Sequence, residues 1–253
     1  MLSEERRRKI LELVQRDGRV VVTDLARRFR TSLITIRKDL ENLHQQGRIH
    51  RAHGGALPVD ASALRDPSLQ EKERLHRKEK LRIAAAAAHL IQPGQVIILD
   101  SGTTSTAVAR AAKHVPNLTV ITNAVNIAAE LAGTDIEVLL TGGTLRKNSF
   151  SLVGPLAEDS LRRITADLLF LAVDGFDVDY GLTTPNLLEA KVNRAMMESA
   201  KTTVVVCDSS KFGRRSLSLI APTAAVHHTI TDDKISAKHL RGLREAGVKV
   251  IIA

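Results

Sequence analysis

Polar, glycine-containing motifs follow several apolar runs in the second half of this 253-residue chain. Hydroxyl groups, together with backbone N–H groups at the start of a helix, can hold a phosphate, and a glycine lets the backbone turn closely. An ordinary turn is the alternative for such a short motif. The first motif follows the run at 96–99 and consists of Asp100, Ser101, Gly102, Thr103 and Thr104.

Two further motifs carry groups that can bind an anion or a polar ligand. Asn123 follows the run at 118–122 and either binds a ligand or caps the next helix. Taken alone, the residue favours the capping role. Gly142 and Gly143 follow the run at 137–141 and allow close backbone approach. Arg146 lies three residues further on and can pair with an anion, although a turn with solvated charges has the same composition.

The last two motifs are acidic and basic. Asp174 follows the run at 168–173 and begins an acidic turn, which we interpret as a connection rather than a metal site. Lys211 lies after the run at 203–207 and can meet a phosphate or a carbonyl group. Ligands of open parallel sheets bind beyond the carboxyl ends of the strands. Five such motifs therefore predict one polar-ligand cleft, with no metal and no cofactor.

These motifs need a sheet that brings strand ends together. Short Val/Ile/Leu runs that alternate with helices predict an open, mostly parallel α/β sheet over residues 76–253. We expect further strands at 229–231 and 249–252, and helices at 104–114, 125–132, 155–163, 186–200 and 236–246. Residues 58–75 are assigned to a linker, and a charged helix is expected at 71–91.

The N-terminal part has the pattern of a helix-turn-helix. Thr23 and Ser32 are N-cap candidates for two helices, and Arg30 and Thr31 suit a tight turn between them. In the second helix, Ile36, Leu40 and Leu43 have the spacing of an inward-facing stripe. A basic, glycine-containing hairpin follows, so residues 1–57 are predicted to form a winged helix-turn-helix; a plain helical region with solvated arginines is the alternative.

The second helix of this motif is the element expected in the major groove of DNA. Side chains near its start and on its outer face can read bases or contact phosphates, and those of the hairpin can touch the backbone or the minor groove. The predicted DNA contacts are Thr31, Ser32, Leu33, Thr35, Arg37, Lys38, Arg48, Arg51 and His53.

Composition agrees with a polyanionic partner. The formal net charge is +9, and residues 1–57 hold 13 Lys and Arg against 7 Asp and Glu. Aromatic residues are only 2% of the chain, which argues against stacking platforms for single-stranded nucleic acid. One cysteine excludes an internal disulfide, and no run approaches the roughly 18 apolar residues of a membrane span. We expect a cytoplasmic protein that does not enter a membrane.

The whole chain also resembles the DeoR/GlpR family of bacterial transcription regulators. The similarity covers DLARRF, TSLITIRKDLENL and GRIHRAHGGA in the first part, and LDSGTT, TNAVNIA, LTGGTLR, LAVDGFD and DSSKFGR in the second. The resemblance implies a repressor that a phosphorylated sugar releases from its operator. It also implies that the motif at 100–104 holds this ligand, helped by Asn123, Gly142, Gly143 and Arg146, with Lys211 as a further candidate.

The second part also resembles the ribose-5-phosphate isomerase-type fold. Asp174 and Glu189 match acidic residues that transfer protons in that enzyme, but the Lys-Gly-Gly-Gly segment is replaced by Gly-Leu-Thr-Thr-Pro-Asn at 181–186. Without that cation a developing enediolate is poorly stabilised, so Asp174 and Glu189 are expected to bind sugar hydroxyls or brace the cleft. A sugar-phosphate isomerase with a DNA-binding module is the alternative function. Operators with two half-sites predict a homodimer or homotetramer.

Overall fold

The computed structural model describes residues 3–17, 20–46, 48–52, 55–58 and 66–253. The chain divides into two compact units, Met1–Arg65 and Asp66–Ala253. Each unit has its own apolar core, one in the first and two in the second.

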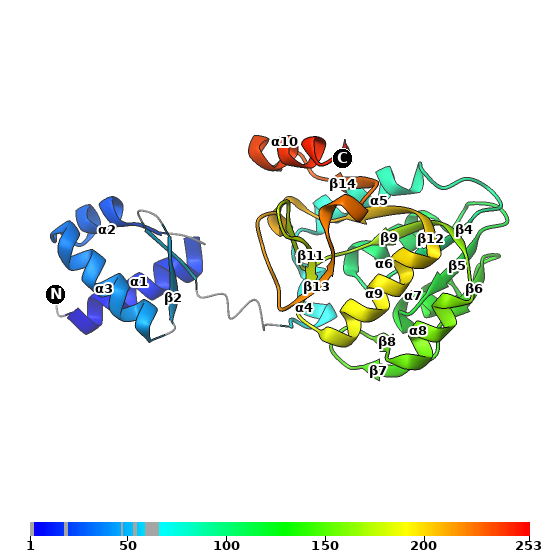
Figure 1. The fold of residues 1–253 in the computed structure, drawn as a ribbon, viewed down its shortest axis with the longest axis horizontal. Helices are drawn as coiled ribbons and strands as arrows, with labels where there is room; N and C mark the ends of the chain where they lie inside the picture. Colours follow the sequence, from blue (N-terminus) through cyan, green and yellow to red (C-terminus); the bar gives the residue numbers. More distant parts are fainter. Residues whose placement is uncertain (1–2, 18–19, 47, 53–54, 59–65) are drawn as a thin grey trace. The chain divides into compact units, whose positions relative to one another are not determined.

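The described part of the first unit is a winged helix-turn-helix (Figure 1). Its helices are α1 (Ser3–Asp17), α2 (Val22–Arg28) and α3 (Leu33–Gln45). Its strands are β1 (Val20–Val21), β2 (Ile49–Ala52) and β3 (Gly55–Pro58), which pair antiparallel in the order β1-β3-β2. The hairpin of β2 and β3 is the predicted wing.

The local signals around α3 are confirmed. Ser32 is the N-cap, and its hydroxyl accepts a hydrogen bond from the Thr35 N–H at 3.0 Å. The stripe of Ile36, Leu40 and Leu43 is at most 1% exposed and packs in the core of the unit. Arg30 has a positive φ of 47°, which closes the tight turn expected between the two helices.

The predicted N-cap at Thr23 is wrong. The cap position is Val21, without a side-chain bond, and the helix α2 begins at Val22. Val20 and Val21 pair with β3, and Val22 is buried in the core, so the chain passes directly from the strand into the helix. Strand pairing and burial therefore override the capping preference of the threonine.

The second unit is built on a seven-stranded parallel sheet in the order β15-β14-β12-β9-β4-β5-β6. The strands are β4 (Val96–Leu99), β5 (Thr119–Thr122), β6 (Glu137–Leu140), β9 (Ala166–Leu171), β12 (Ala200–Val206), β14 (His228–Thr231) and β15 (Lys249–Ile252). The predicted open parallel sheet is thus confirmed, within a few residues at each strand end.

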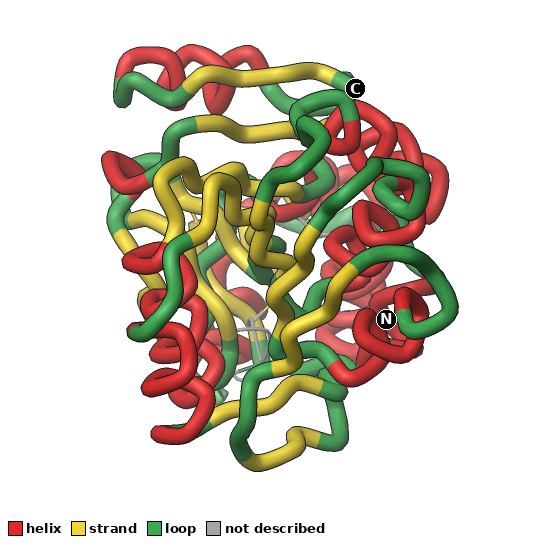
Figure 2. Tube along the Cα trace, turned by 90° about the vertical axis from the view of Figure 1, so that its right-hand side faces the viewer, coloured by secondary structure: helices red, strands yellow, loops and turns green. Residues whose placement is uncertain are grey.

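Helices cover both faces of this sheet, and Figure 2 shows the strands between them. Alternate residues of the strands enter different cores: Ile97 and Leu99 pack on one side and Ile98 on the other. The helices on the first side are α5 (Arg77–Ala88), α6 (Thr103–Ala111) and α7 (Val125–Leu131). Those on the second side are α8 (Pro155–Arg162), α9 (Leu187–Ser199) and α10 (Ala237–Glu245).

Short strands complete the unit and were not predicted. The hairpin of β7 (Thr144–Arg146) and β8 (Ser151–Val153) and the antiparallel sheet of β10 (Gly175–Asp177), β11 (Gly181–Thr184) and β13 (Ser218–Ala221) contain three or four residues per strand. Two 3-10 turns, η1 (Ser209–Lys211) and η2 (Thr223–Ala225), follow β12 and β13. Such strands lie in polar, glycine-rich stretches that carry no long periodic signal.

The helix expected at 71–91 is divided. The short helix α4 (Leu69–Arg74) ends before His76, which has a positive φ of 52°, and α5 begins at Arg77. The helix α4 lies within the range 58–75 that the sequence assigned to the linker. It belongs to the second unit by its contacts.

Asp39 fixes α3 against α1 in the first unit. The residue is 2% exposed, and its carboxylate accepts hydrogen bonds from Arg6 Nε at 2.5 Å and Arg7 Nε at 3.0 Å. Removing a buried carboxylate that pairs with two guanidinium groups is costly, because the charged donors then lack their acceptor.

We therefore expect Asp39→Asn to destabilise the first unit by about 2 kcal/mol. Glu12→Gln is the matched control, because Glu12 is exposed and its pair with Arg8 is long, at 3.9 Å. Urea unfolding of the full-length protein, resolved by hydrogen–deuterium exchange of α3 peptides, measures both effects. Equal losses in the two variants would contradict this role of Asp39.

Candidate functional site

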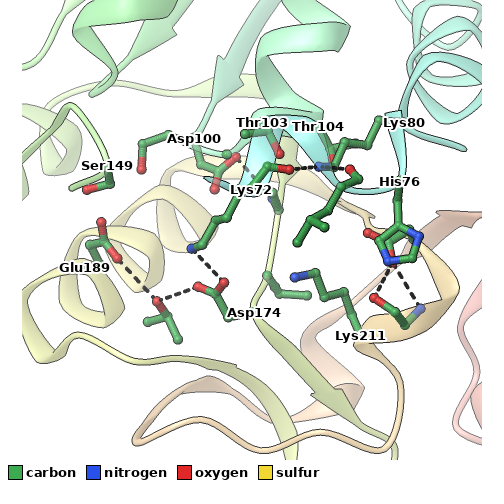
Figure 3. Close-up of a pocket in the computed structure, with 18 of the residues that line it drawn as sticks. Lys72, His76, Lys80, Asp100, Thr103, Thr104, Ser149, Asp174, Glu189 and Lys211 are labelled. Carbon is green, nitrogen blue, oxygen red and sulfur yellow. Dashed lines mark hydrogen bonds and ion pairs between the residues drawn. The ribbon is translucent and has the colours of Figure 1, made fainter. Parts of the chain in front are cut away.

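A polar pocket lies where the order of the parallel strands reverses. The chain runs from β4 through β5 to β6, and then returns to place β9 on the other side of β4. Helices that leave β4 and β9 therefore diverge, which opens a crevice beyond the carboxyl ends of these strands. The residues that follow β4, β9 and β12 line this pocket (Figure 3).

One wall of the pocket is the N-terminus of α6. Gly102 is the N-cap and has no side-chain cap bond, and Ser101, Thr103 and Thr104 line the pocket beside it. A Cβ at Gly102 would lie 2.3 Å from Ala172 Cβ, so only glycine fits where the chain after β9 passes. Helix N–H groups and hydroxyls gathered in this way can bind a phosphate.

Asp100 braces this wall. Its Oδ1 accepts hydrogen bonds from the Ser105 hydroxyl and, at 3.1 Å, from the Ala172 N–H, so it joins the end of β4 to that of β9. Burial raises the pKa of Asp100 to about 7, although the hydrogen bonds from Ser105 and from backbone N–H groups oppose that shift. A carboxyl group that is partly protonated at neutral pH repels an incoming anion less than a full negative charge would.

Cations approach the same space from other elements. Lys72 on α4, Lys80 on α5, Lys211 in η1 and Arg214 line the pocket, with His76 at its rim. The Lys80 ammonium donates to the backbone carbonyls of Lys72 at 2.5 Å and Leu75 at 2.7 Å. Burial lowers the pKa of Lys80 to about 8, which the nearby Asp208 carboxylate opposes.

Acidic and hydroxyl groups line the opposite side. Asp174 Oδ1 pairs with Lys72 Nζ at 2.7 Å, and the Thr184 hydroxyl lies 3.3 Å from both Asp174 Oδ2 and Glu189 Oε2. Burial raises the pKa of Asp174, but the Lys72 and Lys211 cations outweigh it and hold that pKa below its usual value. Carboxylates here can accept hydrogen bonds from the hydroxyl groups of a ligand.

The pocket brings together most, though not all, of the predicted effector residues. Asp100, Ser101, Gly102, Thr103, Thr104, Asp174, Glu189 and Lys211 line it. Asn123, Gly142, Gly143 and Arg146 are not among its lining residues.

The residues outside the pocket support the β7–β8 hairpin. Asn123 does not cap α7, whose N-cap is Ala124; its Nδ2 donates to the Leu152 carbonyl at 3.1 Å. Gly143 has a φ of 127°, and a Cβ there would lie 2.6 Å from the Val153 carbonyl oxygen, so the hairpin needs a glycine. A Cβ on Gly142 would make only ordinary contact with Leu156.

Arg146 reaches the pocket indirectly. One of its guanidinium nitrogens pairs with Glu189 and lies 3.2 Å from the Ser149 hydroxyl, and the other pairs with Asp66. The anion that Arg146 was expected to bind is therefore a pair of carboxylates of the chain itself. Glu189 also accepts a hydrogen bond from the Ser151 hydroxyl at 2.9 Å.

Lys72 and Lys80 were not predicted as site residues from the sequence. Both lie in a run of charges at 71–80 that is typical of a solvated helix, and nothing in their spacing distinguishes them from Lys78 or Arg77. Only the break at His76 brings the two lysines toward one pocket. Asp208 and Arg214 lie on either side of Lys211 in the motif DSSKFGR and also line the pocket.

The candidate DNA interface is the outer face of α3. Leu33, Arg37 and Lys38 are exposed there, as is Ile34, which is 75% exposed and was not among the predicted contacts. An isoleucine left in solvent on this face can contact the methyl group of thymine.

The remaining predicted DNA contacts are placed less uniformly. Ser32 is exposed and Thr31 and Thr35 are half-buried, the Thr35 hydroxyl lying 2.8 Å from that of Ser32. On the wing, Arg48 is exposed, whereas the side chain of Arg51 and all of His53 lie outside the described residues.

The described part of the chain has neither a candidate metal site nor a helix that could span a membrane. Within the described ranges, His, Cys, Asp and Glu side chains form no group of three or more that could hold a metal ion. None of the helices there has both the length and the apolar character needed to cross a membrane.

Comparisons with known proteins give a consistent result. A family model described as the DeoR-like helix-turn-helix domain matches residues 6–61, and one described as the DeoR C-terminal sensor domain matches residues 75–233. The chain is 43% identical over 252 residues to a putative aga operon transcriptional repressor of Escherichia coli O157:H7, covering 99% of this chain and 94% of that protein. It is 33% identical over 233 residues to the glycerol-3-phosphate regulon repressor of Escherichia coli strain K12, covering 92% of each.

Among solved structures, that of ribose 5-phosphate isomerase A from Methanocaldococcus jannaschii is similar to part of this chain. It aligns with 54% of this chain and 54% of its own, with a TM-score of 0.40 and 18% identity.

The raised pKa of Asp100 gives a pH prediction. Between pH ~4 and ~7 the unfolded chain loses the Asp100 proton, whereas the folded protein keeps it, so stability contributed by this group falls as pH rises through that window. We expect the wild type to lose about 2–4 kcal/mol relative to Asp100→Asn across this range. Urea unfolding of both proteins at several pH values measures the difference. A stability difference that does not vary with pH would contradict the shift.

Proposed function

This chain belongs to the DeoR family of helix-turn-helix transcriptional regulators, and on that premise we propose that it represses a carbohydrate-catabolism operon and is released from its operator by a phosphorylated sugar. The observation that carries the effector class is the arrangement of the pocket. The N-terminus of α6, several cations and the acids Asp174 and Glu189 all line it.

This arrangement suits a ligand with one anionic end and several hydroxyl groups. A phosphate takes the helix N–H groups, the Thr103 and Thr104 hydroxyls and the Lys211 ammonium. The hydroxyl groups of a sugar donate to the carboxylates of Asp174 and Glu189. One relative is named after a phosphorylated metabolite, as the glycerol-3-phosphate regulon repressor.

Sensing is favoured over turnover by the contacts of the two acids. Glu189 Oε1 is paired with Arg146 and accepts from Ser151, and Glu189 Oε2 lies beside the Thr184 hydroxyl. Asp174 is paired with Lys72. A carboxylate that is ion-paired with a cation is a weaker base for removing a proton from carbon, but its remaining lone pairs can still accept hydrogen bonds from hydroxyl groups. We therefore propose a binding protein rather than an isomerase.

For DNA binding, α3 enters the major groove with Leu33, Ile34, Arg37 and Lys38 toward the bases and phosphates. Arg48 on the wing contacts the backbone. A homodimer or homotetramer in the cytoplasm supplies two recognition helices for two half-sites.

The effector is identified by fluorescence anisotropy of a labelled fragment from upstream of the gene. Full-length protein is titrated onto the DNA at two salt concentrations, and a panel of sugar phosphates, glycerol 3-phosphate and the unphosphorylated sugars is then added. We expect salt-sensitive binding, reversed by one phosphorylated compound and not by its unphosphorylated form. Tight binding that no compound reverses would overturn the effector proposal. Aldose–ketose conversion of the same panel would overturn the assignment as a binding protein.

The docking of α3 is tested by charge removal. We expect Arg37→Ala with Lys38→Ala to lower operator affinity by about 2–4 kcal/mol and to reduce the salt dependence by about two phosphate contacts. The control removes the same charge from exposed positions of the second unit, Lys238→Ala with Lys249→Ala. Operator affinity that is the same for the two double variants would contradict this docking.

A further inference from the structure

The helix α4 is held to the second unit by polar contacts. It has six residues, of which Leu69 and Lys72 are half-buried and the others are exposed. A helix this short is not stable by itself in water, and α4 has no fully buried apolar side chain to hold it. Its position therefore depends on the hydrogen bonds and ion pairs that its ends and its side chains make.

These contacts converge on the pocket. At the start of α4, Leu69 N–H donates to the Asn148 carbonyl at 2.7 Å, and Asp66 pairs with Arg146. In the middle, Lys72 pairs with Asp174. At the end, the Lys80 ammonium donates hydrogen bonds to the backbone carbonyls of Lys72 and of the C-cap Leu75.

Two of these ion pairs lead to acids of the pocket. Lys72 of α4 binds Asp174 directly, and Asp66, three residues before α4, is connected through Arg146 to Glu189. Glu73 of α4 makes a longer, exposed pair of 3.6 Å with Arg110 of α6. Figure 3 shows Lys72 extending into the pocket between the side that carries Asp100 and Thr103 and the side that carries Asp174. Burial lowers the pKa of Lys72, but Asp174, Glu189 and Asp66 outweigh it and raise that pKa, so the side chain is a cation.

Lys72 therefore differs from the other pocket cations. Lys211 belongs to η1, directly after a strand of the sheet, whereas Lys72 belongs to a short helix without a fully buried residue. An anion in the pocket adds a second partner for the Lys72 ammonium and strengthens the attachment of α4. The chain that leads from the DNA-binding unit enters the second unit immediately before α4.

We propose that the anionic group of the effector binds Lys72 and draws α4 onto the pocket, and that α4 passes effector binding to the DNA-binding unit. This inference rests on the proposed function for the identity of the effector. A ligand shifts an equilibrium only through different contacts in the two states, and Lys72 provides that difference.

Hydrogen–deuterium exchange of residues 69–76 in the full-length protein tests the attachment. Without ligand, we expect Lys72→Met to raise exchange about 5-fold, because one ion pair is lost. Arg74→Met, an exposed cation on the same helix, and Lys211→Met, a pocket cation on another element, are the matched controls and are expected to match the wild type. Wild-type exchange in Lys72→Met would overturn the inference.

The ligand arm uses the sugar phosphate selected by the panel, and inorganic phosphate in parallel. At saturation we expect slower exchange of α4 and DNA release in the wild type and in Lys211→Met, which needs more ligand. Lys72→Met is expected to bind the ligand with neither effect. Slower α4 exchange and DNA release in saturated Lys72→Met would overturn the inference.

The two proposals fail separately. If no sugar phosphate binds the wild type, the proposed effector class fails. Inorganic phosphate then decides the role of Lys72, and α4 exchange that responds equally to phosphate in the wild type and in Lys72→Met would overturn it.

Discussion

The hydrogen bond from the Ala172 N–H to Asp100 Oδ1 joins the ends of β4 and β9, the two strands between which the chain reverses its direction across the sheet. A crevice at such a position widens as the flanking helices diverge, and this bond limits how far the two strand ends can separate. Gly102 allows the close approach, because any Cβ there would collide with Ala172. The N-terminus of α6 is thereby held at the base of the pocket.

The charges around this base form two linked sets. Lys72 and Asp174 are one pair, and Arg146 with Glu189 and Asp66 is the other. The Thr184 hydroxyl lies between the two acids. That hydroxyl links the two sets, and each set includes a residue of the segment that begins the second unit, Lys72 in one and Asp66 in the other.

The placement of Arg146 shows how a pocket can depend on residues that do not line it. Its guanidinium group fixes Glu189 from behind, and the β7–β8 hairpin that carries it needs Gly143 for its conformation. Asn123 holds the same hairpin through Leu152. The strand-end motifs after β5 and β6 therefore support the wall of the site, while those after β4, β9 and β12 form its surface.

The sequence alone predicts the winged helix-turn-helix, the parallel sheet and the pocket residues that follow β4, β9 and β12. Each of these has a local signal: the cap at Ser32, the stripe of Ile36, Leu40 and Leu43, and apolar runs followed by polar turns. It did not determine the start of α2, where strand pairing overrides Thr23, or the small strands, which are too short to show a period. That Lys72 and Lys80 face the pocket is visible only in the folded structure. Their run of charges has the pattern of a solvated helix, and the break at His76 changes the direction of the chain. Only the tertiary structure placed Arg146 behind Glu189, since ion pairs between distant segments leave no pattern in the spacing of residues along a chain.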